Sequence, residues 1–124
     1  MVTGRTVAIL VPNLIGNVPD WDRIRQIADR HGLPVVEDSC DTLGPRLRGT
    51  PTGLRSTISV TSFANSHVIT AAGNSGMVMT DDDHLRDRAV MLRRWGGRSE
   101  LHSSRELPGL LCQKARRSVE SIGS

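Results

Sequence analysis

The stretch TVAILVPNLIGNVPDWDRIRQIADRHGLPVVED, residues 6–38, decides the fold of this chain. Residues 6–12 form a continuous apolar run, which is typical of a parallel strand covered on both faces. Asp20 can cap a helix and Gly32 can end it. Four apolar residues between them recur at the spacing of one helical face: Trp21, Ile24, Ile27 and Ala28. Residues 34–37 supply a second strand, so the stretch predicts a strand–helix–strand unit with parallel strands and a right-handed crossover.

The rest of the chain extends this unit. Residues 44–56 are rich in Gly, Pro, Thr and Arg and predict a long loop, whereas residues 57–63 and 76–80 predict a third and a fourth strand. The acids at 81–83 favour the amino end of a helix, and we interpret them as capping groups rather than metal ligands. That helix has an apolar face: Leu85, Ala89, Leu92 and Trp95. We therefore expect an α/β fold with part of a mostly parallel sheet and flanking helices.

Length and composition limit the possible functions. The 124 residues suffice for one domain at most. The net charge of +3 comes from arginines scattered among acids, which is typical of a solvated surface rather than of a nucleic-acid-binding stripe. Tyrosine is absent, which also disfavours base stacking. Residues 99–124 lose the regular pattern and predict a degenerate or disordered tail or, alternatively, a basic segment that binds a partner.

The sequence also carries expectations about compartment. Cys40 and Cys112 lie far apart and form no CxxC pattern, so reduced thiols are favoured over a disulfide. We find no basic segment followed by an apolar run at the amino terminus, and no apolar stretch of the length that crosses a membrane. These features predict a cytoplasmic protein without a membrane partner.

Two short segments bring polar groups to the ends of predicted strands. VVEDSCD, residues 35–41, and SFANSH, residues 62–67, each begin as a strand and continue into a loop. Ligands of open parallel sheets bind outside the carboxyl ends of the strands, so both segments can face one pocket. An aspartate such as Asp38 can pair with a protonated ring nitrogen, and a histidine such as His67 can move protons. That combination is what pyridoxal-type chemistry requires.

The same segments carry a resemblance to a known family. EDSCDTLG at residues 37–44 and TSFANSHVIT at residues 61–70 together resemble the DegT/DnrJ/EryC1/StrS family, the pyridoxal-phosphate sugar aminotransferases and their dehydrase relatives. The resemblance covers roughly residues 5–98 and implies part of an aspartate aminotransferase-like large domain. His67 occupies the position of the lysine that forms the Schiff base in the family. This exchange and the acidic motif resemble the 4-keto-6-deoxyhexose 3-dehydrase subgroup.

The resemblance implies a role for each site residue. Asp38 would bind the pyridine nitrogen, Ser62 the cofactor phosphate, and Cys40 would pack on the ring. Asp41 lies where relatives often have Gln or His facing the phenolic oxygen. His67 would be the base in C3 dehydration of a nucleotide-linked 4-keto-6-deoxy sugar, with pyridoxal phosphate or pyridoxamine phosphate as the cofactor. Full-length relatives are expected to form homodimers.

The residues leave several alternatives open. From the residues alone, Asp38 can be a loop cap, Ser62 a buried hydroxyl bonded to the backbone, and His67 a packing residue. The chain can also descend from an aminotransferase that lost its lysine, or be a non-catalytic remnant, because family members are much longer. We therefore divide it into a partial large domain, residues 1–98, and a tail. Ser75 departs from the family's Gly-Glu-Gly-Gly turn and would strain it if that position had positive φ.

Overall fold

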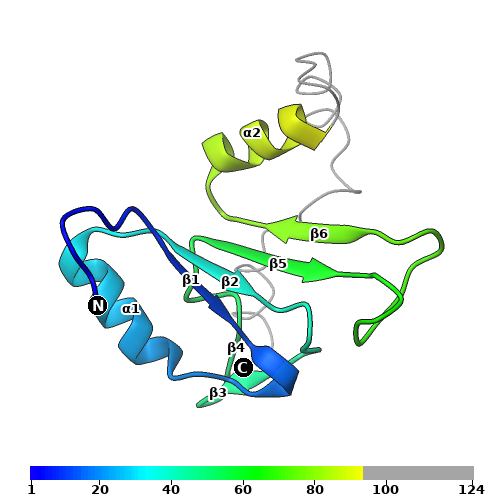
Figure 1. Ribbon diagram of the computed structural model, residues 1–124, viewed down its shortest axis with the longest axis horizontal. Coiled ribbons are helices and arrows are strands. Elements are labelled where there is room, and N and C mark those ends of the chain that lie inside the picture. The colour runs from blue at the N-terminus through cyan, green and yellow to red at the C-terminus, as the bar shows by residue number, and fades with distance from the viewer. Residues whose placement is uncertain (94–124) are drawn as a thin grey trace, which may run out of the picture. The chain divides into compact units, whose positions relative to one another are not determined.

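The computed structural model describes residues 1–93 (Figure 1). The predicted tail at 99–124 and Trp95 lie outside the described residues. The chain divides into two units, one formed by residues 1–80 and the other beginning at Asp81, and each is described by itself. The first unit contains the sheet and the candidate site. In the second unit, helix α2 (Asp83–Arg93) begins where the acids predicted it: Asp82 Oδ1 accepts hydrogen bonds from the backbone N–H groups of His84 and Leu85.

The first unit is built on a four-stranded sheet (Figure 1). Its strands are β1 (Ile9–Pro12), β2 (Val35–Asp38), β5 (Ile58–Ser62) and β6 (Gly76–Met79), in the spatial order β1-β2-β5-β6. The pairs β1–β2 and β2–β5 are parallel, whereas β6 runs antiparallel to β5. The predicted α/β class with a mostly parallel sheet is therefore confirmed.

Helix α1 (Trp21–His31) connects β1 to β2 and has the ends that the sequence predicted. The Asp20 side chain accepts a hydrogen bond from the backbone N–H of Arg23, which satisfies one of the free donors of the first turn. Gly32 ends the helix with φ of 61°, a left-handed conformation that glycine adopts without steric cost. Each end of α1 is thus determined by a single residue that directly flanks the helix.

The core lies between α1 and one face of the sheet. Four hydrophobic side chains are buried there: Trp21, Ala28, Leu33 and Val35. Side chains alternate along a strand, so Val35 and Glu37 of β2 point toward this core while Val36 and Asp38 point to the opposite face. The opposite face thus carries the residue on which the site prediction depends.

Two elements differ from the sequence-based prediction. β1 begins at Ile9, because the partner strand begins at Val35 and Pro34 has no backbone N–H to offer to residues further upstream. The predicted loop at 44–56 contains a short antiparallel hairpin, β3 (Arg46–Leu47) and β4 (Thr50–Pro51). Each of its strands has only two residues, too few for a period to show.

The hairpin turn also lacks its usual sequence signal. Arg48 and Gly49 form the turn with φ of 51° and 79°. Turns of this kind usually contain Asn-Gly or Asp-Gly, because both central residues need positive φ. The unfavourable positive φ of Arg48 is compensated by ion pairs from its guanidinium to Asp20 and Asp22 at the start of α1. Tertiary contacts therefore stabilise a turn that no local sequence signal predicts.

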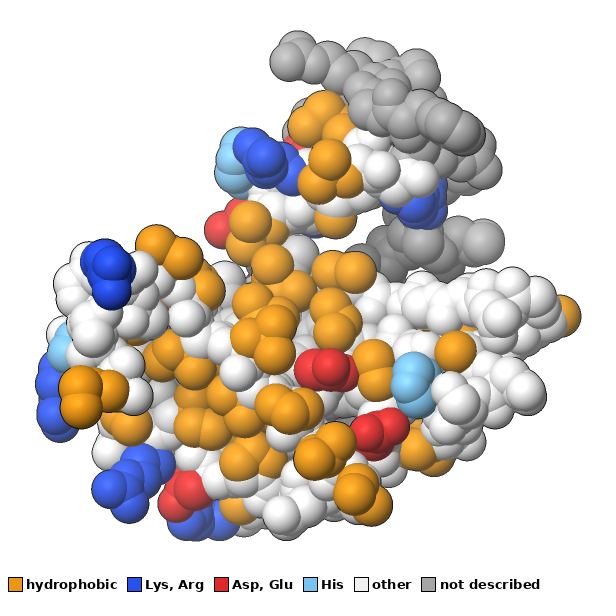
Figure 2. Space-filling view, viewed as in Figure 1, with side chains coloured by type: hydrophobic (Ala, Val, Ile, Leu, Met, Phe, Trp, Pro, Cys, Tyr) orange, Lys and Arg blue, Asp and Glu red, His pale blue; other side chains and the backbone are white. Residues whose placement is uncertain are grey.

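Hydrophobic side chains also lie exposed along the strands. Figure 2 shows them gathered over the strands of the sheet. Leu10 of β1 is 67% exposed and Val78 of β6 is 52% exposed. Both lie on the sheet face opposite α1, because Leu10 pairs with Val36 and Val78 pairs with Val60. The described part of the chain therefore has a second apolar face beside the one that packs on α1.

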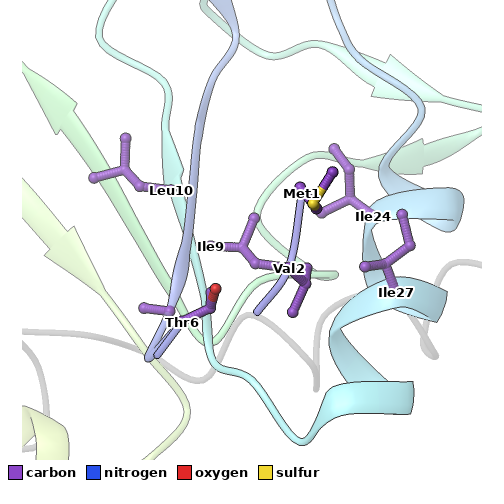
Figure 3. A pocket seen from close by; sticks show the side chains of 8 residues that line it. Met1, Val2, Thr6, Ile9, Leu10, Ile24 and Ile27 are labelled. Atoms are coloured by element: carbon purple, nitrogen blue, oxygen red, sulfur yellow. The ribbon is translucent and has the colours of Figure 1, made fainter. Parts of the chain in front are cut away.

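A hollow lies between the amino-terminal segment, β1 and α1 (Figure 3). Ile24 and Ile27 of α1 lie across from Ile9, with Val2 between them. Thr6 is the single polar side chain of its lining, and none of the candidate site residues lines it. It therefore plays no part in the candidate site.

Within the described residues, no helix combines the length and the apolar character needed to cross a membrane.

Candidate active site at the carboxyl edge of the sheet

Asp38 and Ser62 lie at the carboxyl ends of neighbouring parallel strands. Asp38 is the last residue of β2 and pairs with Val60, and Ser62 is the last residue of β5. Because Ser62 follows Val60 by two residues, it lies on the same face of the sheet as Asp38. The structure therefore brings these two predicted site residues to one edge and one face, where ligands of open α/β sheets bind.

A tight turn after β2 positions the Asp38 carboxylate. Its Oδ1 accepts a hydrogen bond from the backbone N–H of Cys40 at 3.0 Å. The backbone carbonyl of Asp38 accepts another from Asn13 N at 2.8 Å, and Ser39 N donates to Val60 O at 2.8 Å. The half-buried side chain of Asp38 is thus fixed at a turn that is itself bonded to both neighbouring strands.

Cys40 has the electrostatics of a protonated thiol. Burial, followed by its hydrogen bond to Asp38, raises the pKa of Cys40 to about 11, and the charges of Asp38 and Asp41 act in the same direction. A thiol in this environment is uncharged at neutral pH and is therefore a poor nucleophile. The arrangement fits the predicted packing role. Asp41 lies half-buried in the same turn, and its proposed contact with the cofactor stays a prediction.

Ser62 begins the loop that connects β5 and β6. Its Oγ accepts a hydrogen bond from the backbone N–H of Ala64 at 3.1 Å. Within residues 1–93 its O–H group donates to no partner, so the hydroxyl can still donate one hydrogen bond. A donor of this kind, at a strand end, suits a phosphate oxygen.

His67 lies in the same loop. Its backbone N–H donates to Ala64 O at 3.0 Å, and the loop closes where Phe63 N donates to Ser75 O at 2.8 Å. The side chain is half-buried, and its Nδ1 is enclosed without a hydrogen-bond partner among the described residues. Buried polar atoms are normally paired, so this nitrogen needs an explanation. An unpaired Nδ1 that exchanges a proton with a bound ligand is one explanation, and it suits the predicted role of His67 as a base.

The turn before β6 resolves the question of strain at Ser75. Positive φ occurs at Gly73 (83°) and Asn74 (56°) but not at Ser75. Asparagine is one of the residues that tolerate the left-handed region, and Asn74 Oδ1 also accepts from Asn65 N at 3.1 Å. Gly76 lies close to β5, where an added Cβ would be 3.0 Å from the Thr61 carbonyl oxygen. Ser75, at the position of a family glycine, therefore lies outside the positive-φ region and does not strain the turn.

A buried polar cluster lies on the other face of the same strand ends, and sequence reasoning missed it. Asn13 and Glu37 are both fully buried, and Ser39 is 8% exposed. The Glu37 carboxylate accepts hydrogen bonds from Asn13, Ser39 and the backbone of Gly53. One signal was available: Glu37 follows Val35 by two residues, and this places a charged group on the core-facing side of a strand.

The residues of this edge fit a pyridoxal-type cofactor. The carboxylate of Asp38 suits a protonated pyridine nitrogen, and the donor of Ser62 suits a phosphate. A lysine for a Schiff base is missing from the described chain, because Lys114 is the only lysine in the sequence. The site therefore has its proton-transfer candidate in His67.

The fold is the α/β fold of the pyridoxal-phosphate-dependent aminotransferases. The sequence profile of the DegT/DnrJ/EryC1/StrS aminotransferase family matches residues 1–110, and the chain belongs to this family. The predicted family is thereby confirmed.

Sequence relatives include aminotransferases and a dehydratase. The dTDP-3-amino-3,4,6-trideoxy-alpha-D-glucose transaminase of Streptomyces venezuelae is 39% identical over 99 residues, which are 80% of this chain and 26% of the relative. The GDP-4-keto-6-deoxy-D-mannose 3-dehydratase of Yersinia pseudotuberculosis is 35% identical over 111 residues, 87% of this chain and 27% of the relative. The chain thus spans about a quarter of the length of these relatives.

Solved structures give the same picture. DesV of S. venezuelae, in complex with a ketimine intermediate, has a TM-score of 0.74 and 40% identity over 79% of this chain and 26% of its own. NtdA of Bacillus subtilis, with bound cofactor PMP, has a TM-score of 0.66 and 31% identity over 73% of this chain and 20% of its own. A histidine-to-asparagine mutant of GDP-4-keto-6-deoxymannose-3-dehydratase, with bound GDP-perosamine, has a TM-score of 0.61 and 28% identity. The match covers 73% of this chain and 22% of its own.

Proposed function

We propose that this chain carries part of the cofactor site of a sugar-modifying enzyme of the family, residues 1–98 being a piece of its large domain. The reaction we propose is C3 dehydration of a nucleotide-linked 4-keto-6-deoxy sugar. The observation that carries this proposal is the absence of any lysine before Lys114, together with His67 where the resemblance implies the family lysine. The names of relatives that act on nucleotide-linked sugars support the substrate class.

Four side chains would hold the cofactor, pyridoxal phosphate or pyridoxamine phosphate. Asp38 would bind the pyridine nitrogen and favour its protonated form, because a carboxylate stabilises a positive charge beside it. Ser62 would donate to the phosphate, and the uncharged side chain of Cys40 would pack on the ring. Asp41 would lie near the phenolic oxygen. When bound, the cofactor supplies a ring that accepts electrons.

His67 would supply acid–base catalysis. An imidazole has an unperturbed pKa of ~6.5, so it takes up and releases a proton near neutral pH. It does not form the stable imine that a lysine amine forms with an aldehyde. The chemistry therefore favours a base that moves a proton over a residue that holds the cofactor covalently.

A second candidate function is sugar transamination. The dTDP-sugar transaminases among the relatives favour it, and the match to DesV reaches 40% identity. Without a lysine at position 67, turnover with an amino donor should be poor. A non-catalytic remnant is the third reading, and the binding experiment below separates it from both enzymes.

Cofactor binding by the purified chain tests the proposal. Pyridoxamine phosphate is titrated into the protein while induced circular dichroism is followed in the cofactor absorption band. We expect a saturable signal that is lost in Asp38→Asn, because the amide does not carry the charge that pairs with the pyridine nitrogen. Arg30→Ala, an exposed change on α1, is the matched control and should keep the signal. A folded wild-type protein without any signal would contradict the proposal and support the remnant.

A further inference from the structure

We propose that Glu37 and Asn13 are positioning residues that hold Asp38 in place from the opposite face of the sheet. The significance of this for the cofactor rests on the proposed function of Asp38. The structural part, that the pair determines the geometry of the 38–42 turn, rests on contacts of the described residues alone. Three observations support it: the contacts of Glu37, those of Asn13, and the direction of every hydrogen bond in the cluster.

The Glu37 carboxylate connects three parts of the fold. Its Oε1 accepts from Asn13 Nδ2 at 2.9 Å and from Ser39 Oγ at 2.9 Å. Its Oε2 accepts from the backbone N–H of Gly53, beyond the β3–β4 hairpin, at 2.6 Å. Glu37 has no ion-pair partner among the described residues, so these donors alone compensate its burial. Removal of one donor would leave a buried acceptor unpaired.

Asn13 connects this carboxylate to the turn that carries Asp38. Its backbone N–H donates to the Asp38 carbonyl at 2.8 Å, and its own carbonyl accepts from Thr42 Oγ1 at 2.7 Å. Its side-chain Nδ2 also donates to Ser39 Oγ at 2.8 Å. Asn13 thus contacts both ends and the middle of the 38–42 turn. Since Asp38 Oδ1 is held by Cys40 N within that turn, the orientation of the carboxylate depends on the cluster.

The direction of the hydrogen bonds is determined throughout. Trp21 Nε1 can only donate, and it donates to Asn13 Oδ1 at 2.9 Å. Asn13 must therefore present its NH₂ group to Glu37. Gly53 N can also only donate, so both Glu37 oxygens must accept. Trp21 and Gly53 each fix one oxygen of the pair, so exchange of one group alone creates a conflict at the contact between positions 13 and 37, where two donors or two acceptors then meet.

This polarity allows a test by exchange of the two groups. In Glu37→Gln one amide NH₂ faces either Asn13 Nδ2 or Gly53 N, which are both donors. In Asn13→Asp two carboxylates face each other. In the double variant Asn13→Asp with Glu37→Gln, the new amide at position 37 donates to the new carboxylate at position 13, and its oxygen still accepts from Gly53. The carboxylate at position 13 also still accepts from Trp21. The double variant restores every pair with the bond between positions 13 and 37 reversed, and Ser39 Oγ then donates to position 13 and accepts from position 37.

Amide hydrogen exchange measured by NMR on the full chain is the primary readout, because it needs no cofactor. We expect Glu37→Gln to lower the protection of the Cys40 and Thr42 amides about tenfold relative to the Leu33 amide, which lies in the core beyond the network. The double variant should recover most of this protection. Ile24→Val, a core change outside the network, is the control. It should lower the protection of the Cys40 and Thr42 amides in the same proportion as that of the Leu33 amide.

The same variants are then titrated with pyridoxamine phosphate. Glu37→Gln should weaken the induced dichroism several-fold and the double variant should restore it, if Asp38 binds the cofactor as proposed. A wild-type chain without dichroism defeats the proposed function, and hydrogen exchange still decides the positioning role. The positioning proposal is overturned if Cys40 and Thr42 keep wild-type protection relative to Leu33 in Glu37→Gln. It is also overturned if the double variant recovers none of the loss.

Discussion

At the scale of single residues, the environment of Cys40 is the most informative detail of the site. Asp38 accepts a hydrogen bond from the Cys40 backbone, and the pKa of the thiol is raised to about 11 from 9.0, chiefly by burial and then by Asp38. The thiol is therefore a local probe of the Asp38 carboxylate. Its titration reports whether a negative charge is present beside it.

Cys40 should react slowly with alkylating agents at neutral pH, with a rate that rises toward an apparent pKa of about 11. Asp38→Asn should lower this pKa but leave it above 9.0, because burial, the largest cause, remains. The measurement is the pH dependence of the alkylation rate in a Cys112→Ser background. An apparent pKa at or below 9.0 in the wild type would refute this description of the site.

At the scale of elements, the β3–β4 hairpin depends on ion pairs to the start of α1. Arg48 pairs with Asp20 and Asp22, and Arg55 pairs with Asp22. The Arg48 guanidinium holds the pKa of Asp20 down at about 2, and Arg48 and Arg55 lower the pKa of Asp22. Because these carboxylates lie at the protein surface, each pair is screened by solvent and stabilises the fold only modestly.

The stability contributed by these pairs should depend on pH in one direction. A carboxylate with a lowered pKa in the folded state stabilises the fold above its unfolded pKa of 3.8, and this contribution is lost as pH falls toward about 2. We therefore expect Arg48→Ala to lower the urea midpoint at pH 7, with a difference from wild type that shrinks between about pH 4 and pH 2. Arg30→Ala, on the same helix as Asp22, should show no such trend. A difference independent of pH would contradict the ion-pair explanation.

At the scale of the whole molecule, the chain matches only part of the length of its relatives. It spans about a quarter of their length, and apolar side chains such as Leu10 and Val78 are exposed on the sheet face opposite α1. A test of the reaction therefore needs a complete enzyme around the site. The Yersinia dehydratase, 35% identical over the matched part, offers that frame.

A chimera provides this test. Residues 35–76 of this chain replace the matching segment of the Yersinia dehydratase, so that the turn after β2 and the β5–β6 loop come from this protein. We expect the chimera to retain dehydration and to lose it by about a hundredfold or more in His67→Lys, because a positioned base contributes about 10²–10⁴ in rate. Product analysis with the 4-keto sugar provides the measurement. Transamination by the unaltered chimera would favour the second candidate function.

The limits of prediction follow from which signals are local. The ends of α1 were predicted because Asp20 and Gly32 act within one helical turn. Asp38 and Ser62 were expected at one edge because parallel strands end together, and the structure bears out that placement. The Asn13–Glu37 bond joins residues 24 apart, and no sequence pattern specifies such a pair. The direction of β6 likewise depends on how the loop from 63 to 75 closes.

The sequence by itself determined the α/β class, the strand–helix–strand unit and the family, because these depend on periodicity, caps and short motifs that each lie within a few residues. The tertiary structure decided the β3–β4 hairpin, the start of β1, the antiparallel β6 and the buried cluster around Glu37. All of these depend on partners far away in the chain. A strand needs a neighbour, and a buried carboxylate needs donors, and only the folded chain supplies them.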